Sequence, residues 1–512
     1  MLRILKYFKW YYYIVIILIV LLVYIQVSCD LTLADYIQKI VDMLLAKNTD
    51  RNVLGRVALE MAGISVGSIL ARASTSYLAV RMAADFSRRL RKMIFEKVDS
   101  FSMEEINSFS TASLITRTTN DVQQVQQVVM IGLNMAITAP IMAIRGIGMV
   151  LGFSTEITSI IAVGIVAIVL MVNVIFVVVI PKFKKIQKLI DRLNLVTREN
   201  LTGIRVIRAY NGEQYQEEKF GEVNDEVTKT NIFVNRAMSL IDPFMFFTLN
   251  MVNLLIIWIG AYLLSNGSLG DMSVGLGRLT SYTMYTMQII FSFMMLTFLF
   301  ILIPRGSVSA NRIMEVLNKN VKVSDPISNT PSTDLKGAIE FKDVCFKYPH
   351  AETCVIENIN LSIKQGETVA FVGSTGSGKS TLINLIPRFY DVTMGELLVN
   401  GVNVKDFKLK DLRSLIGYVP QQGILFSGTI ASNLSIGENE IPKDKMMEAI
   451  KVAQAEEFVS KLELGLESPI AQGGTNVSGG QKQRLSIARA IVNNPEIYIF
   501  DDSIAPGEAF CG

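Results

Sequence analysis

Six long apolar stretches, separated by polar segments, dominate the N-terminal part of the chain. A helix that crosses the hydrocarbon core of a bilayer needs about 20 predominantly apolar residues. The pattern therefore predicts six transmembrane helices, at about Tyr11–Val27, Val53–Ala79, Met130–Phe153, Thr158–Pro181, Phe244–Ser265 and Leu279–Ile303.

The first of these stretches follows a basic flank and the interfacial residue Trp10. A cleaved signal peptide is the alternative interpretation, but the stretch is long for the apolar region of such a peptide. The residues before Cys29 also lack the small or branched apolar residue that a lipobox carries three positions before its cysteine. We therefore interpret the stretch as the first transmembrane helix.

Two of the polar segments are long and rich in lysine and arginine, one after the second apolar stretch and one after the fourth. Because positively charged loops stay on the cytoplasmic side, we expect both loops and both termini in the cytoplasm. Apolar residues recur in them at helical spacing, as at Leu90, Ile94 and Val98, so the helices are expected to continue out of the bilayer. Polar breaks at Met103–Ser110 and Glu199–Arg205 predict that each loop turns back through a short helix.

The composition of the chain changes after the sixth apolar stretch. From about Asn318 to Lys336 the chain is rich in Ser, Thr, Asn, Asp and Pro, as is typical of a linker. Short β-branched runs then alternate with amphipathic stretches, which is the pattern of an α/β domain. The predicted organisation is a membrane domain over residues 1–317, a linker over 318–336 and an α/β domain over 337–512.

Composition narrows the possible chemistry. Only 19% of the 512 residues are charged and 50% are hydrophobic, whereas a soluble domain carries about 25% charged residues. The single histidine, His350, excludes a multi-histidine zinc site, and four scattered cysteines exclude a disulfide framework. A formal net charge of +3 leaves no electrostatic footprint for nucleic acid. The six apolar stretches make the lipid bilayer an expected partner.

A glycine-rich loop carries the clearest chemical signal. It lies between the apolar segment Thr368–Val372, which we predict to be a strand, and the helical stretch Leu382–Phe389. This order is that of a phosphate-binding P-loop, in which backbone N–H groups and a helix N-terminus hold the phosphates. Lys379 is expected to reach the β- and γ-phosphates and Ser380 to ligate Mg²⁺. The predicted loop residues are Gly373, Ser374, Thr375, Gly376, Ser377, Gly378, Lys379, Ser380 and Thr381.

Two further motifs lie downstream of the loop. The apolar run Ile497–Phe500 predicts a strand that ends in Asp501 and Asp502, of which one can hold Mg²⁺ and the other can orient water. Ser478, Gly479, Gly480 and Gln481 open a helical pattern and form a second anion-binding helix N-terminus. Since one P-loop already binds one triphosphate, the second site suggests that two copies of the domain meet around shared nucleotides.

Together these motifs resemble those of an ATP-binding cassette (ABC) exporter of the half-transporter type. The resemblance covers nearly the whole chain and rests on the Walker A loop Gly373–Thr381, the signature Val477–Gln481 and the Walker B strand Ile497–Asp501. It implies an all-α six-helix transmembrane domain followed by an α/β P-loop NTPase domain, with ATP and Mg²⁺ as ligands.

The same resemblance assigns further residues. It identifies Gln421 as the Q-loop glutamine, a catalytic residue together with Asp502, which also joins Ser380 and Asp501 around Mg²⁺. It identifies Tyr348 as the aromatic residue that stacks on adenine. The stretches Ala112–Asp121 and Glu199–Ala209 are similar to the coupling regions of the family. The mechanism that it implies is the sandwiching of ATP between two cassettes, with export of a small amphipathic drug, lipid or peptide across the plasma membrane by alternating access.

The sequence departs from the family at its catalytic base. A glutamate normally follows the Walker B aspartate directly, but this chain has Asp502, whose carboxylate is one methylene shorter. A misplacement of about 1 Å can cost roughly 100-fold in rate. Aspartate in this position is similar to the degenerate half of a heterodimeric exporter, whose intact signature completes the partner's site. A homodimer with weak activity is the alternative.

The second departure is at the end of the chain. Residues Ile504–Gly512 do not follow the family pattern, and the sequence stops several tens of residues early, which suggests a truncation or a frameshift. His350 lies too early to be the family's switch histidine. We therefore expect weak or absent ATPase activity from this chain alone, and two alternatives stay open: an ATP-binding subunit that does not hydrolyse ATP, and a non-functional remnant.

The motifs do not identify the cargo. The stretch Phe291–Phe300, rich in methionine and phenylalanine, could line an adaptable hydrophobic cavity or could face lipid.

Overall fold

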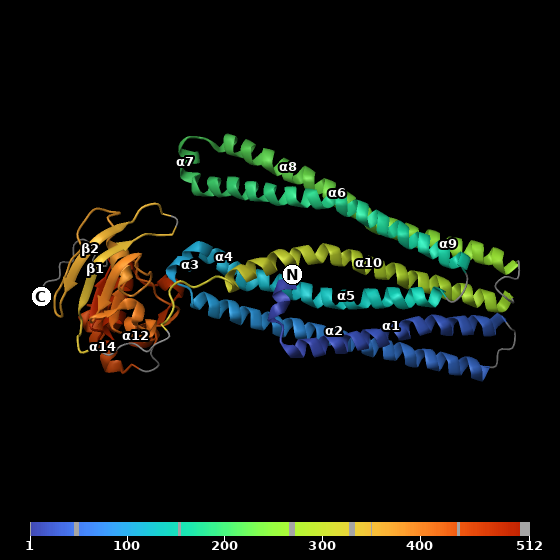
Figure 1. Cartoon of the computed structure of the whole chain (residues 1–512), viewed down its shortest axis with the longest axis horizontal. Helices are drawn as coiled ribbons and strands as arrows, with labels where there is room; N and C mark the ends of the chain where they lie inside the picture. The colour runs from blue at the N-terminus through green and yellow to red at the C-terminus, as the bar shows by residue number, and fades with distance from the viewer. Residues whose placement is uncertain are drawn as a thin grey trace. The chain divides into compact units, whose positions relative to one another are not determined.

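The computed structural model describes residues 2–45, 51–151, 155–265, 272–326, 333–349, 351–437 and 441–501 (Figure 1). The chain forms two compact units. The membrane unit comprises Met1–Phe95 and Ile115–Leu317, and the cassette unit comprises Glu96–Leu114 and Asn318–Gly512. The cassette unit thus includes a short segment that lies far upstream of the linker in sequence.

Long helices make up the membrane unit, and the described residues contain six that are long and apolar enough to cross a bilayer, as predicted. Most are far longer than a bilayer requires, which confirms that they continue beyond it. Residue Leu240 alone separates α8 from α9, and the two form one span. The helices are α1 (Trp10–Leu45), α2 (Arg51–Asp99), α5 (Val122–Leu151), α6 (Thr155–Thr202), α8 (Glu213–Ser239), α9 (Ile241–Ser265) and α10 (Met272–Leu317).

The membrane helices pack around two apolar cores, both of which include residues of α6, α9 and α10. In the first core these residues meet buried residues of α1 and α5, and its members include Val23, Val150 and Ile289. A second core joins α6 to α8 and α9, and α6 and α8 run together to the short helix α7 (Ile204–Ala209) (Figure 1). Lipid tails are as apolar as these side chains, so the helices associate through close packing rather than through the hydrophobic effect.

Glycines allow this close packing at helix crossings. A Cβ atom built on Gly146 of α5 would lie 2.7 Å from Cγ1 of Ile289 of α10. One built on Gly164 of α6 would lie 2.6 Å from Cγ2 of Val252 of α9. Both distances are shorter than two carbon atoms can approach, so these positions require glycine for the observed packing.

Short helices occur at both predicted turns. The first loop contains α3 (Met103–Phe109) and α4 (Thr111–Thr116), followed by a π-helical turn, η2 (Arg117–Asp121), and the second contains α7. At the start of α3, Ser102 and Glu105 form a capping box, which satisfies two backbone N–H groups at the helix N-terminus.

The cassette unit combines β-sheets with short helices. An antiparallel sheet has the order β2-β1-β3-β4, with β1 (Ile339–Phe346), β2 (Ile356–Ile363), β3 (Met394–Val399) and β4 (Val402–Asn403). A parallel pair joins β5 (Ile416–Val419) to β8 (Ile497–Phe500), and β6 (Gly428–Thr429) pairs with β7 (Pro469–Ile470). The helices are α11 (Lys379–Leu385), α12 (Leu409–Ser414), α13 (Ile430–Leu434), α14 (Lys443–Val452), α15 (Glu456–Ser460) and α16 (Gly479–Ile491).

Two apolar cores support this unit. One lies between the sheets and α11 and includes Phe341, Leu385 and Ile499. The other lies among α13, α14 and α16 and includes Leu434, Ile450 and Leu485. The predicted fold class, a six-helix membrane domain followed by an α/β domain, is therefore confirmed.

One predicted element is wrong. The segment Thr368–Val372 is not a strand, because no ladder in the described part of the chain includes it. The parallel sheet consists of β5 and β8, which pair with each other and not with this segment. Val372, at the end of the segment, is 95% exposed. A run of β-branched residues becomes a strand only where a neighbour satisfies its backbone.

The glycine at the α5–α10 crossing gives a test of the membrane packing. Replacing Gly146 by valine should destabilise the protein by about 1–3 kcal/mol, because the new side chain overlaps Ile289. Gly148→Val, on the same helix, is the matched control, since no atom lies within 4 Å of a Cβ built there. The measurement is the thermal midpoint for loss of monodisperse protein in detergent, and equal midpoints for the two variants would contradict this packing.

Candidate nucleotide site

Glycine permits the backbone of the P-loop at three positions. Gly376 and Gly378 have φ angles of +85° and +88°, a left-handed conformation that L-residues rarely adopt. A Cβ on Gly373 would lie 2.8 Å from the Oγ atom of Ser377. Gly378 is also the residue that precedes α11, so the loop leads directly into a helix N-terminus. This backbone is suited to binding an anion through N–H groups.

The lysine of the loop lies over the loop itself. The Nζ atom of Lys379 donates hydrogen bonds to the carbonyl oxygens of Gly373, at 2.8 Å, and Ser374, at 2.9 Å. The ammonium group is therefore held against the same backbone whose N–H groups would contact phosphates. A positive charge in this position is available to an anion that enters the loop.

A hydrogen bond links the two predicted metal ligands. Ser380 donates from Oγ to Oδ1 of Asp501 at 2.7 Å, across 121 positions of sequence. Asp501 follows β8 directly and is only 9% exposed. A hydroxyl and a carboxylate are hard oxygen ligands of the kind that Mg²⁺ prefers, so this donor set fits the ion that the motif implies.

The Q-loop glutamine follows the neighbouring strand. Gln421 is exposed and lies two residues after β5, whose Val419 is paired with Phe500 of β8. Because parallel strands end at the same edge of a sheet, Gln421 and Asp501 both follow that edge. Tyr418 lies in β5 beside them, and burial together with the negative charge of Asp501 raises the pKa of its hydroxyl to about 12. That hydroxyl donates to Oδ1 of Asn384 in α11 at 3.0 Å, which ties the strand to the helix of the P-loop.

The predicted adenine-stacking residue lies at the end of the loop. The hydroxyl oxygen of Tyr348 is 3.0 Å from Oγ1 of Thr381. Its ring packs edge to face against Phe346, with ring centroids 4.9 Å apart, and against Tyr390, at 5.5 Å. Tyr390 was not singled out from the sequence. The only feature of the local sequence that could have drawn attention to it is its place next to Phe389, shortly after α11.

Tyr390 extends this aromatic cluster to α3, in the first of the two long basic loops. The Nδ2 atom of Asn107 in α3 donates to the Tyr390 hydroxyl at 3.2 Å, across 283 positions of sequence. Burial raises the pKa of that hydroxyl, which therefore stays protonated in the physiological pH range. A continuous set of contacts thus runs from α3 through Tyr390 and Tyr348 to Thr381, all within the cassette unit.

A buried carboxylate fixes α3 in place. Glu105 is 1% exposed, and its side chain accepts from the backbone N–H of Ser102 at 2.8 Å and of Lys322 at 3.3 Å. The neighbouring Glu104 forms an ion pair with Nζ of Lys322 at 2.6 Å. The cluster joins two segments of the chain, because Ser102 and Glu105 lie shortly after the chain first enters the cassette unit and Lys322 lies shortly after it enters the unit again.

These cassette contacts lie upstream of the predicted coupling stretch Ala112–Asp121. The end of that stretch is fixed instead to α10 of the membrane unit. There, Arg117 pairs with Glu315 at 2.8 Å, and Ser309 donates to Oδ1 of Asp121 at 2.8 Å. Residues of the predicted stretch therefore belong to both units, whereas α3 belongs to the cassette unit alone.

The signature motif is an exposed helix N-terminus. Ser478 caps α16, because its Oγ accepts from the N–H of Gln481 at 3.3 Å while its own N–H donates to Oε1 of Gln481 at 2.8 Å. No atom of the described residues lies within 4 Å of a Cβ built on Gly479 or Gly480. The packing of this chain therefore does not require glycine at either position. Asp502 and His350 lie outside the described residues.

Comparison with known proteins gives the family. Residues 16–293 match the family described as ABC transporter transmembrane region, and residues 356–505 match the family described as ABC transporter. An uncharacterized ABC transporter ATP-binding protein of Mycobacterium tuberculosis is 37% identical over 471 residues, which span 91% of this chain and 80% of the relative. A multidrug resistance-like ATP-binding protein, MdlA of Buchnera aphidicola, is 31% identical over 77% of this chain and 67% of its own length.

The fold is also that of a solved transporter. A bacterial Atm1-family ABC exporter with ATP bound superposes with a TM-score of 0.78, at 21% identity, over 96% of this chain and 85% of that one. The matched families are fused in one chain here, in the order that the motifs indicated. The chain therefore belongs to the ABC transporter family, as a multi-pass membrane protein with a nucleotide-binding domain that couples ATP hydrolysis to transport.

Proposed function

We propose that the chain is one half of an exporter that moves a small amphipathic molecule across the plasma membrane by alternating access. Both termini and the cassette lie in the cytoplasm in this proposal. The observation that supports it is the hydrogen bond between Ser380 and Asp501, since Ser380 directly follows Lys379 of the P-loop in sequence and the three residues could then act together on Mg²⁺ and phosphate. We assign residues 1–317 to the membrane domain, 318–336 to the linker and 337–512 to the cassette.

The residues of the site have distinct roles in this proposal. The P-loop backbone and Lys379 hold the phosphates of ATP, and Tyr348 stacks on adenine. Ser380, Asp501 and Gln421 hold Mg²⁺, which neutralises phosphate charge when bound. Asp502 orients the attacking water. The open surface of Gly479 and Gly480 receives the ATP of a second cassette, and the signature thereby completes the partner's site.

We further infer that the second half is a different chain. ABC exporters work as dimers of half-transporters, and the aspartate at position 502 supports a heterodimer in which this chain's own Walker site turns over slowly. A homodimer is the second possibility. The same substitution supports an alternative function, that of a subunit that binds ATP but does not hydrolyse it.

The contacts around α3 provide a route by which nucleotide binding reaches the membrane helices. Thr381 contacts Tyr348, Tyr348 contacts Tyr390, and Tyr390 contacts α3, which continues from α2 after a short break. A rearrangement at the end of the P-loop is transmitted if this set of contacts moves as one body.

Transport itself tests the proposed function. Inside-out vesicles that contain the full chain, together with a second half-transporter, should take up at least one of a set of cationic, neutral and lipid-like fluorescent amphiphiles when ATP is added. The variant Lys379→Ala should abolish this uptake, because it removes the charge that holds the phosphates. Uptake that persists in this variant, or without ATP, would contradict an ATP-driven exporter.

The length of the residue at position 502 gives a second test. Replacing Asp502 by glutamate restores the missing methylene and should raise ATP turnover by the purified protein by up to about 100-fold. Turnover is measured as phosphate release with saturating ATP and Mg²⁺. The control is Asp225→Glu, the same change at an exposed position of α8. No increase in the Asp502→Glu variant would show that this position does not limit hydrolysis.

The contact between Asn107 and Tyr390 is tested by a double-mutant cycle. Asn107→Ala and Tyr390→Phe should each reduce the stimulation of ATP turnover by transported substrate, by about two- to tenfold, since each removes one hydrogen bond worth about 0.5–1.5 kcal/mol. Because both act on the same bond, the double variant should be no worse than either single variant. Unchanged affinity for ATP in all three variants is the control, and additive losses would rule out this route.

A further inference from the structure

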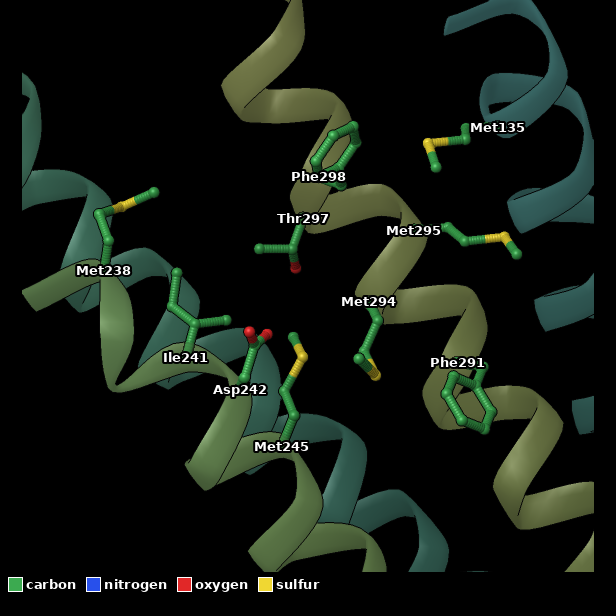
Figure 2. Close-up of a pocket in the computed structure, with 10 residues that line it drawn as sticks. All are labelled: Met135, Met238, Ile241, Asp242, Met245, Phe291, Met294, Met295, Thr297 and Phe298. Atoms are coloured by element: carbon green, nitrogen blue, oxygen red, sulfur yellow. The ribbon is translucent and has the colours of Figure 1, made fainter. Parts of the chain in front are cut away.

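The membrane unit contains a cavity of about 380 Å³ (Figure 2). Its walls come from α5, α8, α9 and α10, and most of its lining is methionine and phenylalanine, including Met135, Met245, Met294, Phe291 and Phe298. Pockets that bind small molecules have volumes of about 300–1,000 Å³, so this one has room for a single small ligand.

The walls combine a fixed side with an adaptable one. Met245 is 1% exposed and belongs to the apolar core that joins α6 to α8 and α9, so its side of the cavity is backed by packed side chains. On the opposite side, Phe298 of α10 is 46% exposed. Methionine side chains are flexible and polarisable and can adjust to ligands of different shape.

One residue among those that line the cavity is charged. The carboxylate of Asp242 extends from α9 toward α10, next to the side chain of Met245 (Figure 2). Within the described part of the chain, no hydrogen bond or ion pair joins it to another residue, and the side chain is exposed. The nearby hydroxyl of Thr297 is already used, since it donates to the carbonyl oxygen of Phe293 at 2.9 Å.

The position of Asp242 in α9 explains how the charge is tolerated. It lies in the first turn, directly after the break at Leu240, where the positive end of the helix dipole favours an acidic residue. This interaction contributes about 0.3–1 kcal/mol and does not neutralise the charge. The cavity therefore presents one negative charge in a wall made mainly of methionine and phenylalanine.

We propose that this cavity binds a small organic cation with a bulky apolar body, which makes such cations a cargo class of the exporter. The assignment rests on the proposed function. A weakly hydrated cation is cheap to desolvate, and the carboxylate of Asp242 replaces the lost solvent interaction. The faces of Phe291 and Phe298 add cation–π attraction, and the methionines accommodate the apolar body.

Binding to the full chain in nanodiscs of neutral phosphatidylcholine, without nucleotide, tests the proposal. The probe is tetraphenylphosphonium, and the matched probe is tetraphenylborate, an anion of the same shape and size. Saturable binding of the cation, above that of empty nanodiscs, should be at least tenfold tighter than binding of the anion. Removal of one charge–charge attraction by Asp242→Asn should weaken cation binding about tenfold.

Three controls accompany this measurement. Asp242→Glu keeps the charge and should retain most of the affinity. Asp225→Asn makes the same change of charge on an exposed part of α8 and should leave binding unchanged. Met294→Ala, which shortens an apolar side chain of the wall, should weaken the binding of the cation and keeps the site testable if Asp242→Asn does not fold.

The outcomes separate this inference from the proposed function. Equal affinity for the two probes, or full affinity in both Asp242→Asn and Met294→Ala, would overturn the cation site. ATP-driven uptake of other amphiphiles without any binding of tetraphenylphosphonium would also overturn it but would leave the exporter intact. Binding with the expected charge dependence but no ATP-driven flux would support the site and refute the exporter.

Discussion

The carboxylate of Glu105 is the interaction on which the joining of the two chain segments of the cassette unit depends. The chain enters the cassette unit twice, through the segment Glu96–Leu114 and again from Asn318 onward. Glu105 accepts a backbone hydrogen bond from each of these two segments, from Ser102 and from Lys322, which is 217 positions after Glu105. Its burial makes the loss of these bonds costly, since a buried carboxylate that loses hydrogen-bond donors is not compensated by water. The cap of α3 and the start of the linker are therefore held in one fixed arrangement.

This arrangement fixes α3 within the cassette unit. Asn107, on the same short helix, reaches the aromatic cluster at the P-loop, while Arg117 and Asp121, shortly after it, are fixed to α10. The loop thus contains anchors to both units within a few turns of helix. A π-helical turn carries the anchors to α10, and such turns frequently occur at functional sites in helices. The short distance along the chain limits how much motion can be absorbed between the anchors.

The sequence predicts those parts of the structure that depend on local pattern. Six apolar stretches of membrane length suffice to predict the spans, and the glycine spacing of the P-loop predicts its backbone. The strand at Thr368–Val372 was predicted wrongly, because strand formation depends on a neighbour that local pattern does not reveal. The contact of Asn107 with Tyr390 and the place of Asp242 in a methionine-rich wall were also not predictable. The contact joins distant residues, and in the sequence Asp242 is indistinguishable from an ordinary acidic residue at a helix start.

The exposed position of Val372 has a consequence for how the P-loop behaves. In the described chain the segment before the loop has no ladder partner, so the loop is positioned mainly from its other side, through Ser380, Thr381 and α11. A loop held from one side has more conformational freedom to lose when phosphates bind its backbone. Nucleotide would then act as a folding partner of the loop as well as its substrate, with a stabilisation of about 2.7 kcal/mol at a concentration 100 times Kd.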